Sequence, residues 1–309
     1  MPITATEKIW MDGDLLPWGE ARVHVLTHSL HYGGGVFEGI RAYPTERGVS
    51  VFRLRDHIRR LLASARVLMM NVPYSADQLV SATKQVVREN GLDQGCYIRP
   101  IIFLGYGEMG LNPLPCGVTV AIAAWPWGTY LGDEGVKSGI RVKVSSWQRH
   151  DPNAMPTAAK ITGMYVNSSL AKAEAIKAGY DEAILLAPDG KVSECTGENV
   201  FAVKSGRLVT PPISQAGALS GITLDSVQMI ARDLGYDVAF EAMVRSDLYL
   251  ADEAFLTGTA AEVVPIREVD DRVVGDGLPG PVTTRIQAEY FAAVRGEIDR
   301  YKDWLDLVD

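Results

Sequence analysis

Lys160 lies in a stretch of small residues, TAAKITG over 157–163, that leaves little side-chain bulk around its amine. A lysine that forms a Schiff base needs such a shaped, desolvated site, because its ordinary pKa of ~10.4 must fall towards ~7 to 8 before the amine reacts. Tyr165 follows five residues later and supplies a phenol. We therefore take Lys160 as a candidate nucleophile, with a solvated surface lysine as the alternative.

Two turns and one arginine have the composition of an anion site. Leu219 to Thr223, LSGIT, leads into a predicted helix, whose N-terminal amides attract negative charge. Gly258-Thr259-Ala260 follows a predicted strand, and its small side chains let an anion approach the backbone closely. Arg60 adds a full positive charge to the same candidate phosphate site. An ordinary helix start and an ordinary strand end are the alternatives for the two turns.

Two further patterns predict no site. Residues 105–110 match GxGxxG after a strand, but the prolines at 113 and 115 prevent the helix that a dinucleotide site requires. Three histidines resemble metal ligands: His24, His28 and His31. No cysteine or carboxylate joins them before Glu38, and their segment reads as extended or looped, so packing and loop hydrogen bonds are the better interpretation.

The elements that position these residues alternate in type. In the first half we predict a hairpin with its turn at Asp12-Gly13, an amphipathic helix over 53–70 that carries Arg60, and a helix that a capping box at Ser75 opens and Gly91 closes. The predicted strands here are 21–25, 35–43, 49–52, 97–104 and 118–125. This part is a strand-rich α+β unit.

Residues 126–139 are rich in Gly, Pro and acidic side chains, which is typical of a linker. We therefore predict a small N-terminal domain over 1–126, an interdomain loop over 127–139 and a large domain over 140–309. In the large domain the predicted strands are 140–147, 181–187, 191–194, 199–203, 207–210, 236–242, 253–257 and 263–274. The predicted helices follow Lys160 as far as 178 and cover 223–234 and 282–304.

Composition narrows the class of partner. The chain has 309 residues and a formal net charge of −8, which disfavours nucleic acid and favours a small molecule. Its 3 cysteines are too few and too scattered for a disulfide framework or a zinc site. No signal peptide or long apolar run is visible, so we expect a cytoplasmic protein without a membrane partner.

Taken in order, these segments resemble the branched-chain amino-acid aminotransferases of the fold-type IV pyridoxal-phosphate enzymes. The resemblance runs from IWMDGDLLPWGEARVHVLTHSLHYGGGVFEGIRAY through SSWQRHDPNAMPTAAKITGMY, SECTGENVF and GALSGITLDSV to LYLADEAFLTGTAAEVVPI, essentially the whole chain. It implies that fold, pyridoxal 5′-phosphate as cofactor, and reversible transamination between leucine, isoleucine or valine and 2-oxoglutarate. The partners it implies are amino acids and 2-oxo acids, in a homodimer or an assembly of dimers.

The resemblance also implies roles toward the cofactor. Lys160 is catalytic and carries the cofactor covalently, Glu194 meets the pyridine nitrogen and Tyr165 meets the phenolic oxygen. The remaining cofactor contacts that it implies are Arg60, Gly221, Ile222, Thr223 and Thr259 around the phosphate and Leu219 on the ring face. An ionised Glu194 keeps the ring nitrogen protonated, and Lys160, once displaced, moves a proton between the substrate's α-carbon and the C4′ carbon of the cofactor.

For the substrate, the resemblance implies an aromatic wall and a carboxylate receptor. Arg99 in the Tyr97-Ile98-Arg99 sequence receives the distal carboxylate of glutamate, and the backbone of Gly258, Thr259 and Ala260 faces the α-carboxylate. The wall consists of Tyr32, Phe37, Trp127 and Tyr130 beside Tyr97, with Gly39 and Arg41 at the entrance. The triple glycine at 33–35 departs from some relatives and could loosen this wall.

Other activities of the same fold would keep Lys160 and Glu194. These are a D-amino-acid aminotransferase, an R-selective amine transaminase and an aminodeoxychorismate lyase. The segments Phe37 to Gly39, Tyr97 to Arg99 and Gly258 to Ala260 favour the branched-chain type. Outside the class, a non-catalytic binding module is the alternative, and a visible absorption band of the purified protein separates the two.

Overall fold

The computed structural model describes residues 3–128 and 131–308. The described chain divides into two compact units, which we call unit 1 and unit 2. Among the described residues, unit 1 comprises 3–128, 159–164 and 293–308, and unit 2 comprises 131–158 and 165–292. The segment with Lys160 and the C-terminal residues therefore belong to unit 1. The division predicted from the sequence, 1–126 and 140–309, placed both of them in the large domain.

Unit 1 is built on an antiparallel sheet of eight described strands in the order β17-β5-β4-β6-β7-β1-β2, with β3 paired to β6. The strands are β1 (Lys8–Met11), β2 (Asp14–Pro17), β3 (Gly35–Phe37), β4 (Ile40–Thr45), β5 (Gly48–Phe52), β6 (Cys96–Leu104), β7 (Val118–Trp125) and β17 (Leu305–Leu307). The predicted hairpin turn is confirmed, since Asp12 and Gly13 have φ of 48° and 105°. Strand β6 is central, and register pairs its Tyr97 with both Arg41 and Trp125.

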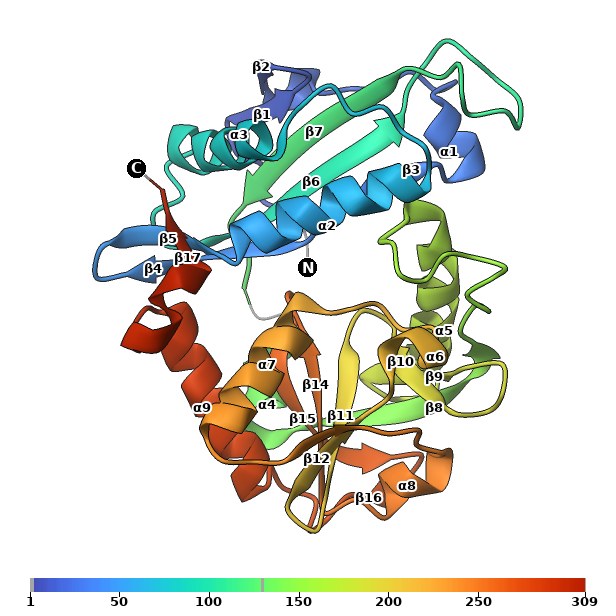
Figure 1. Ribbon diagram of the computed structural model, residues 1–309, viewed down its shortest axis with the longest axis vertical. Helices are drawn as coiled ribbons and strands as arrows, with labels where there is room; N and C mark the ends of the chain where they lie inside the picture. Colours follow the sequence, from blue (N-terminus) through green and yellow to red (C-terminus); the bar gives the residue numbers. More distant parts are fainter. Residues whose placement is uncertain (1–2, 129–130, 309) are drawn as a thin grey trace. The chain divides into compact units, whose positions relative to one another are not determined.

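Two amphipathic helices, α2 (Leu54–Val67) and α3 (Ala76–Glu89), cover one side of this sheet (Figure 1). Helix α2 buries Leu54, Ile58 and Leu61, one apolar stripe at helical spacing, which is the reason the sequence forms this helix. Helix α3 begins with the predicted capping box: the Ser75 hydroxyl accepts from the Gln78 amide, and the Gln78 side chain accepts from the Ser75 amide.

Unit 2 is built on a mixed sheet of nine described strands in the order β10-β9-β8-β15-β14-β11-β12-β13, with β16 paired to β15. The strands are β8 (Ile140–Gln148), β9 (Glu182–Leu186), β10 (Val192–Cys195), β11 (Asn199–Lys204), β12 (Arg207–Thr210), β13 (Val238–Phe240), β14 (Glu253–Gly258), β15 (Glu262–Val269) and β16 (Arg272–Val273). Strand β8 runs parallel to β9 and β15, and β12 runs parallel to β13.

The helices of unit 2 pack on this sheet (Figure 1). They are α4 (Gly132–Ser138), α5 (Tyr165–Lys177), α6 (Ile213–Ala216), α7 (Ile222–Asp233), α8 (Arg245–Tyr249) and α9 (Pro281–Val294), whose last two residues belong to unit 1. Helix α5 rests on the sheet through Ala171 and Ala175, which pack with Ala183 and Leu185 of β9. Such small side chains bring α5 close to the strands.

Several predicted elements are wrong in type or length. Residues 21–25 form no strand, and the apolar side chains of their alternating pattern are largely exposed, with Val23 at 47% and Val25 at 70%. The segment of the three histidines includes a short helix, α1 (His28–Tyr32), which Gly33 ends in the left-handed region. The predicted strand 35–43 is interrupted at Glu38 and Gly39, between β3 and β4. The Glu38 amide still donates to the Pro100 carbonyl of β6, but Pro100 has no amide hydrogen to return a bond.

Two corrections concern the second half of the chain. The predicted loop 127–139 contains α4. The predicted closing helix 282–304 ends at Val294, because Gly296 has a φ of 75°, and the 3-10 helix η3 (Asp299–Trp304) follows. The 3-10 helices η1 (Trp18–Glu20) and η2 (Thr162–Met164) complete the described elements. Among these residues no helix combines the length and the apolar character needed to cross a membrane.

Candidate functional site

In unit 1, Lys160 is fixed by its backbone between β3 and α2. Its amide donates to the Ser64 hydroxyl of α2 at 3.1 Å, and its carbonyl accepts from the Phe37 amide at 3.1 Å. The next residue, Ile161, forms a β-bridge with Val36, and η2 follows. The prediction that a helix follows Lys160 is thus confirmed. The main chain is anchored on both sides, so the position of the side-chain amine is set by its rotamer alone.

Helix α2 presents three polar side chains at helical spacing, His57, Arg60 and Ser64. Arg60 is carried by this helix, as predicted, and its side chain is 15% exposed. Its Nε and Nη2 donate to the two oxygens of Glu38 at 2.7 and 2.8 Å, a bidentate ion pair. Glu38 itself is 0% exposed.

His57 completes this network. Its Nδ1 lies 2.7 Å from Glu38 Oε2, so the ring donates from Nδ1 to the carboxylate. Burial lowers the pKa of His57, although Glu38 opposes the shift. Burial alone would raise the pKa of Glu38, but Arg60 and then His57 outweigh it and hold that pKa well below its usual range. The network at neutral pH is therefore a neutral imidazole, a carboxylate and a guanidinium.

Predicted substrate residues of unit 1 meet around the ring of Phe37. The Lys160 Nζ lies 5.0 Å from the ring centroid of Phe37, and the Arg99 Cζ lies 4.7 Å from the same centroid. Arg99 Nη2 donates to the Tyr97 hydroxyl at 3.0 Å, and Tyr97 stacks on Trp127 with centroids 5.0 Å apart. Among the described residues, the buried Nε of Arg99 has no hydrogen-bond partner. A buried donor of this kind suits a carboxylate ligand.

The glycines beside this cluster are required by close packing. A Cβ on Gly39 would lie 2.0 Å from the Tyr97 hydroxyl oxygen. Gly33 would place a Cβ 2.8 Å from Gly163 Cα, and Gly35 would place one 3.1 Å from the Thr162 hydroxyl oxygen. Gly33 and Gly35 thus let α1 and β3 pack tightly against the segment that carries Lys160, and the effect of the triple glycine on the aromatic wall stays a prediction.

In unit 2, Glu194 is a buried, fully oriented carboxylate on β10. Its Oε1 lies 2.8 Å from Arg149 Nη2, and both side chains are 8% exposed. Its Oε2 accepts from the Leu219 amide at 2.9 Å and from the Asn199 side-chain amide at 3.4 Å. Asn199 also donates to the Leu219 carbonyl at 3.0 Å, so it joins Leu219 to the strand that follows Glu194. These donors favour the ionised carboxylate.

Of the two predicted anion turns, one leads into helix α7 and the other follows strand β14, as the sequence predicted. Gly221 is the N-cap of α7 and provides no side-chain cap. The first two residues of the helix, Ile222 and Thr223, have buried side chains. A Cβ on Gly221 would lie 2.0 Å from Asn199 Oδ1, which explains the glycine. Gly258 ends β14, and Thr259 and Ala260 form the turn to β15. Tyr165 is the first residue of α5 and is partly buried.

Other predicted residues lie differently. Tyr32 is on α1, is 45% exposed and contacts His28, with centroids 4.7 Å apart. Arg41 Nη2 donates to the Trp127 carbonyl at 3.5 Å, a long contact. Tyr130 lies outside the described residues. His28 Nε2 bonds the Gly110 carbonyl and His31 Nε2 the Val25 carbonyl, and no group of metal-binding side chains occurs in the described part of the chain.

Sequence reasoning missed four residues of this site, namely Glu38, His57, Ser64 and Arg149. The stripe of His57, Arg60 and Ser64 on one predicted helix was visible at spacings of three and four residues. Arg149 had no such signal, because its contact with Glu194 joins residues 45 positions apart.

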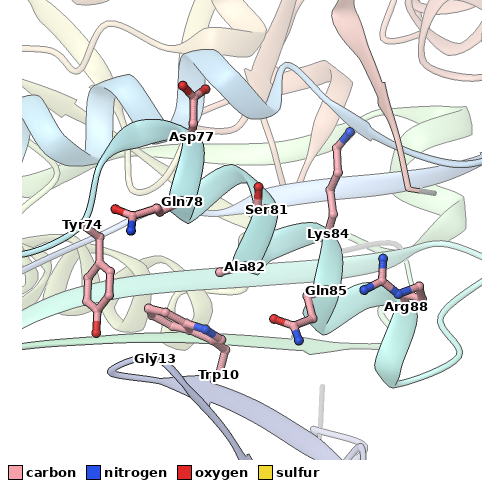
Figure 2. A pocket seen from close by; sticks show the side chains of 10 residues that line it. All are labelled: Trp10, Gly13, Tyr74, Asp77, Gln78, Ser81, Ala82, Lys84, Gln85 and Arg88. Atoms are coloured by element: carbon pink, nitrogen blue, oxygen red, sulfur yellow. The ribbon is translucent and has the colours of Figure 1, made fainter.

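A separate groove of about 680 Å³ lies on unit 1 between α3 and the β1–β2 turn (Figure 2). Trp10 and Tyr74 meet edge to face at its apolar end, with centroids 5.0 Å apart. Figure 2 shows Asp77 and Lys84 of α3 pointing away from Trp10, and Arg88 near the C-terminal end of the helix. The groove contains none of the predicted site residues, and we assign it no chemistry.

Known proteins match the chain over nearly its whole length. Residues 35–269 match the family described as Amino-transferase class IV. The branched-chain-amino-acid aminotransferase of Pseudomonas aeruginosa is 48% identical over 300 residues, 97% of each chain. The crystal structure of the Escherichia coli branched-chain amino acid aminotransferase superposes with a TM-score of 0.96 at 47% identity, covering 99% of this chain and 100% of that one.

Solved relatives also carry the cofactor or its derivatives. The branched-chain amino acid aminotransferase from Thermobaculum terrenum, solved in its PLP form, has a TM-score of 0.91 at 36% identity and covers 98% of this chain and 99% of that one. Two further structures of a branched-chain amino acid aminotransferase, each 48% identical, contain pyridoxamine 5′-phosphate and N-(5′-phosphopyridoxyl)-L-glutamate. The fold and the order of motifs expected from the sequence agree with these relatives. The chain belongs to the class IV aminotransferase family.

Proposed function

We propose that the chain catalyses reversible amino-group transfer between leucine, isoleucine or valine and 2-oxoglutarate, with pyridoxal 5′-phosphate as cofactor. The observation that carries the proposal is the pair of cations over one aromatic ring: Lys160 Nζ and Arg99 Cζ lie 5.0 and 4.7 Å from the Phe37 centroid. A reactive amine and a guanidinium with an unused buried donor suit a small dicarboxylate such as glutamate. The solved relatives with a phosphopyridoxyl-glutamate or pyridoxamine 5′-phosphate ligand support the cofactor.

The donor sets of both units fit this cofactor. In unit 1, Lys160 supplies the amine and Arg60 a phosphate-binding cation. In unit 2, Glu194 suits a protonated pyridine nitrogen because three donors already hold it as a carboxylate. For the other contacts we propose Tyr165 at the phenolic oxygen, Leu219 at the ring face, and Gly221, Ile222, Thr223 and Thr259 at the phosphate. When bound, the cofactor supplies an electron sink for the carbanion at the substrate's α-carbon.

The chain's own residues then perform the proton transfers. Lys160, once its amine is released by the substrate, takes the proton from the α-carbon and returns it at the C4′ carbon. Its main chain is held by Ser64 and Phe37, so the amine stays within reach of both carbons during the transfer. Glu194, with Arg149 at 2.8 Å, holds the proton of the ring nitrogen by remaining ionised.

For the substrate we propose two kinds of contact. Arg99 binds the distal carboxylate of glutamate, and the backbone of Gly258, Thr259 and Ala260 binds the α-carboxylate. Aromatic and apolar surface takes the branched side chains; the residues proposed for it are Tyr32, Phe37, Tyr97, Trp127 and Tyr130, with Gly39 and Arg41 at the entrance. Tyr97 stacks on Trp127 and is 5% exposed, so this part of the wall is rigid.

The test is attachment of the cofactor at Lys160. Purified protein should show a visible absorption band that borohydride removes, and peptide mapping should then find the cofactor mass on Lys160. Lys160→Ala should lose both the attachment and turnover of L-leucine with 2-oxoglutarate, while the exposed Lys191→Ala should retain both. Wild-type-like transamination by Lys160→Ala would refute the proposal.

We also propose a homodimer or an assembly of dimers located in the cytoplasm. The family resemblance supports the assembly, and three free cysteines, Cys96, Cys116 and Cys195, are consistent with a reducing compartment. Sedimentation equilibrium of the full-length protein tests the assembly, where a monomer at micromolar concentration would contradict it. Cell fractionation tests the location.

A further inference from the structure

Glu38 is the centre of a buried polar network that takes no direct part in the proposed reaction. The carboxylate is 0% exposed and receives Arg60 Nε and Nη2 at 2.7 and 2.8 Å and His57 Nδ1 at 2.7 Å. Burying a carboxylate is costly unless its oxygens are satisfied, and here both are. Such a network imposes a defined geometry on its members.

The geometry fixes the guanidinium of Arg60 in particular. Two parallel hydrogen bonds, both donated from one edge of the planar guanidinium, prevent this group from rotating. Glu38 is fixed in turn, because Oε2 accepts from His57 as well as from Arg60. His57 is 1% exposed on α2, one turn before Arg60, so the helix itself sets the spacing between the two donors.

We propose that Glu38 and His57 are positioning residues that orient the Arg60 guanidinium for the phosphate group of the cofactor. This inference rests on the proposed function, in which Arg60 binds that phosphate. His57 acts through Glu38, and Glu38 acts through Arg60. Neither residue touches the substrate in this scheme.

The charges alone lead to the opposite expectation, which makes the inference testable. Glu38 neutralises Arg60 locally, so removing its charge should strengthen the attraction for a phosphate dianion if charge alone decides affinity. If orientation decides, the same change should weaken binding, because the guanidinium loses its bidentate anchor. Glu38→Gln separates the two accounts by the direction of the change in cofactor affinity.

The main test uses two matched replacements of His57. An asparagine amide nitrogen can take the place of Nδ1 and still donate to Glu38, whereas a glutamine amide reaches the position of Nε2. Both variants bury one amide, so they carry a similar folding cost. We expect His57→Asn to keep wild-type affinity for pyridoxal 5′-phosphate and His57→Gln to weaken it about 10-fold or more, as for partners that orient metal ligands.

Pyridoxal, which lacks the phosphate, is the control ligand. Equilibrium dialysis of the full-length protein with each ligand gives two dissociation constants, and their ratio isolates the phosphate contact. His57→Gln and Glu38→Gln should change the constant for pyridoxal 5′-phosphate and leave that for pyridoxal nearly unchanged. Equal losses for both ligands, equal behaviour of the two His57 variants, or tighter binding of the phosphate form by Glu38→Gln would each overturn the inference.

The wild-type protein separates this inference from the proposed function. If it binds no pyridoxal 5′-phosphate, the proposed function itself fails. If it binds the cofactor and forms the bond at Lys160, but the ratio of the two dissociation constants is the same in every variant, only the positioning role fails. Thermal unfolding of each cofactor-free variant checks that the fold is retained during dialysis.

Discussion

Replacing Arg99 by leucine should damage the two half-reactions unequally. Arg99 lies between two rings, with its Cζ 4.7 Å from the Phe37 centroid and 5.3 Å from that of Tyr97. Its Nη2 is used by the Tyr97 hydroxyl, while its buried Nε has no partner among the described residues. The Arg99 side chain is thus held in place while its Nε remains available to donate a hydrogen bond to a carboxylate.

The expected fall in kcat/KM for glutamate follows from the loss of the ion pair between its distal carboxylate and Arg99. Without Arg99 the distal carboxylate of glutamate is desolvated without a partner, which costs about 2 to 4 kcal/mol. That corresponds to a fall in kcat/KM of about 30-fold to about 900-fold. The two cation–π interactions and the bond to Tyr97 disappear for every substrate, so their effects cancel when glutamate is compared with leucine.

The assay follows the cofactor spectrum in single half-reactions of Arg99→Leu, first with L-glutamate and then with L-leucine. Arg41→Leu is the matched control, because Arg41 is a second arginine of the proposed substrate region, with its Nη2 3.5 Å from the Trp127 carbonyl. The glutamate-to-leucine ratio should fall for Arg99→Leu alone. A ratio that is unchanged there, or that falls for Arg41→Leu instead, would refute the assignment and make Arg99 structural.

Three further outcomes are expected. Arg149→Met breaks a buried 2.8 Å ion pair with Glu194, so urea unfolding should show a free energy of unfolding lower by about 3 to 5 kcal/mol, and transamination should be slower. The control is Arg207→Met, which removes an exposed arginine and should unfold like the wild type. Gly39→Ala places a Cβ 2.0 Å from a buried tyrosine oxygen and should lower stability by about 1 to 3 kcal/mol; Gly19→Ala, with nothing within 4 Å, is its control and should not. Burial lowers the pKa of His57 in the folded protein, so as the pH falls this histidine is protonated in the unfolded chain before it is protonated in the folded one. The free energy of unfolding should therefore decrease below pH ~6.5, by at most ~1.4 kcal/mol per pH unit. Urea titrations from pH 7.5 to 5.5 should show this slope in the wild type and a flatter one in His57→Asn; identical slopes would exclude His57 as its source.

Elements with a strong internal pattern were predictable from sequence. The apolar stripe of α2 and the capping box of α3 specify those helices locally, and the structure places both within a few residues of the prediction. Failures occur where long-range packing decides. The strand predicted over 21–25 has the right alternation, but its apolar side chains remain exposed. The break between β3 and β4 depends on Pro100 of β6, 62 residues beyond Glu38.

The candidate site shows the same division. Lys160 could be singled out because a lysine among small residues is a local signal, and its predicted setting before a helix is confirmed. The nucleophile role of Lys160 and the anion-binding roles of Arg60 and the two turns were inferred from local residue patterns. The other roles came from the resemblance, and all of them stay predictions. Arg149 and Glu38 were not predictable, because each acquires its partner only through the fold, at separations of 45 and 22 residues. Ser64 belongs to a polar stripe that was visible in the sequence, but its partner Lys160 lies 96 residues away.

In unit 1, helix α2 supports both Arg60 and Lys160. Helix α2 carries Arg60, whose side chain is anchored by Glu38, and it holds the backbone of Lys160 through Ser64. The two residues proposed to grip opposite ends of the cofactor, at its phosphate and at its reactive carbon, thus share one rigid helix as their support. Their separation cannot change without bending α2, whose Leu54, Ile58 and Leu61 are fully buried. Precision at Lys160 therefore derives from the apolar face of α2, which is the feature that the sequence specifies most clearly.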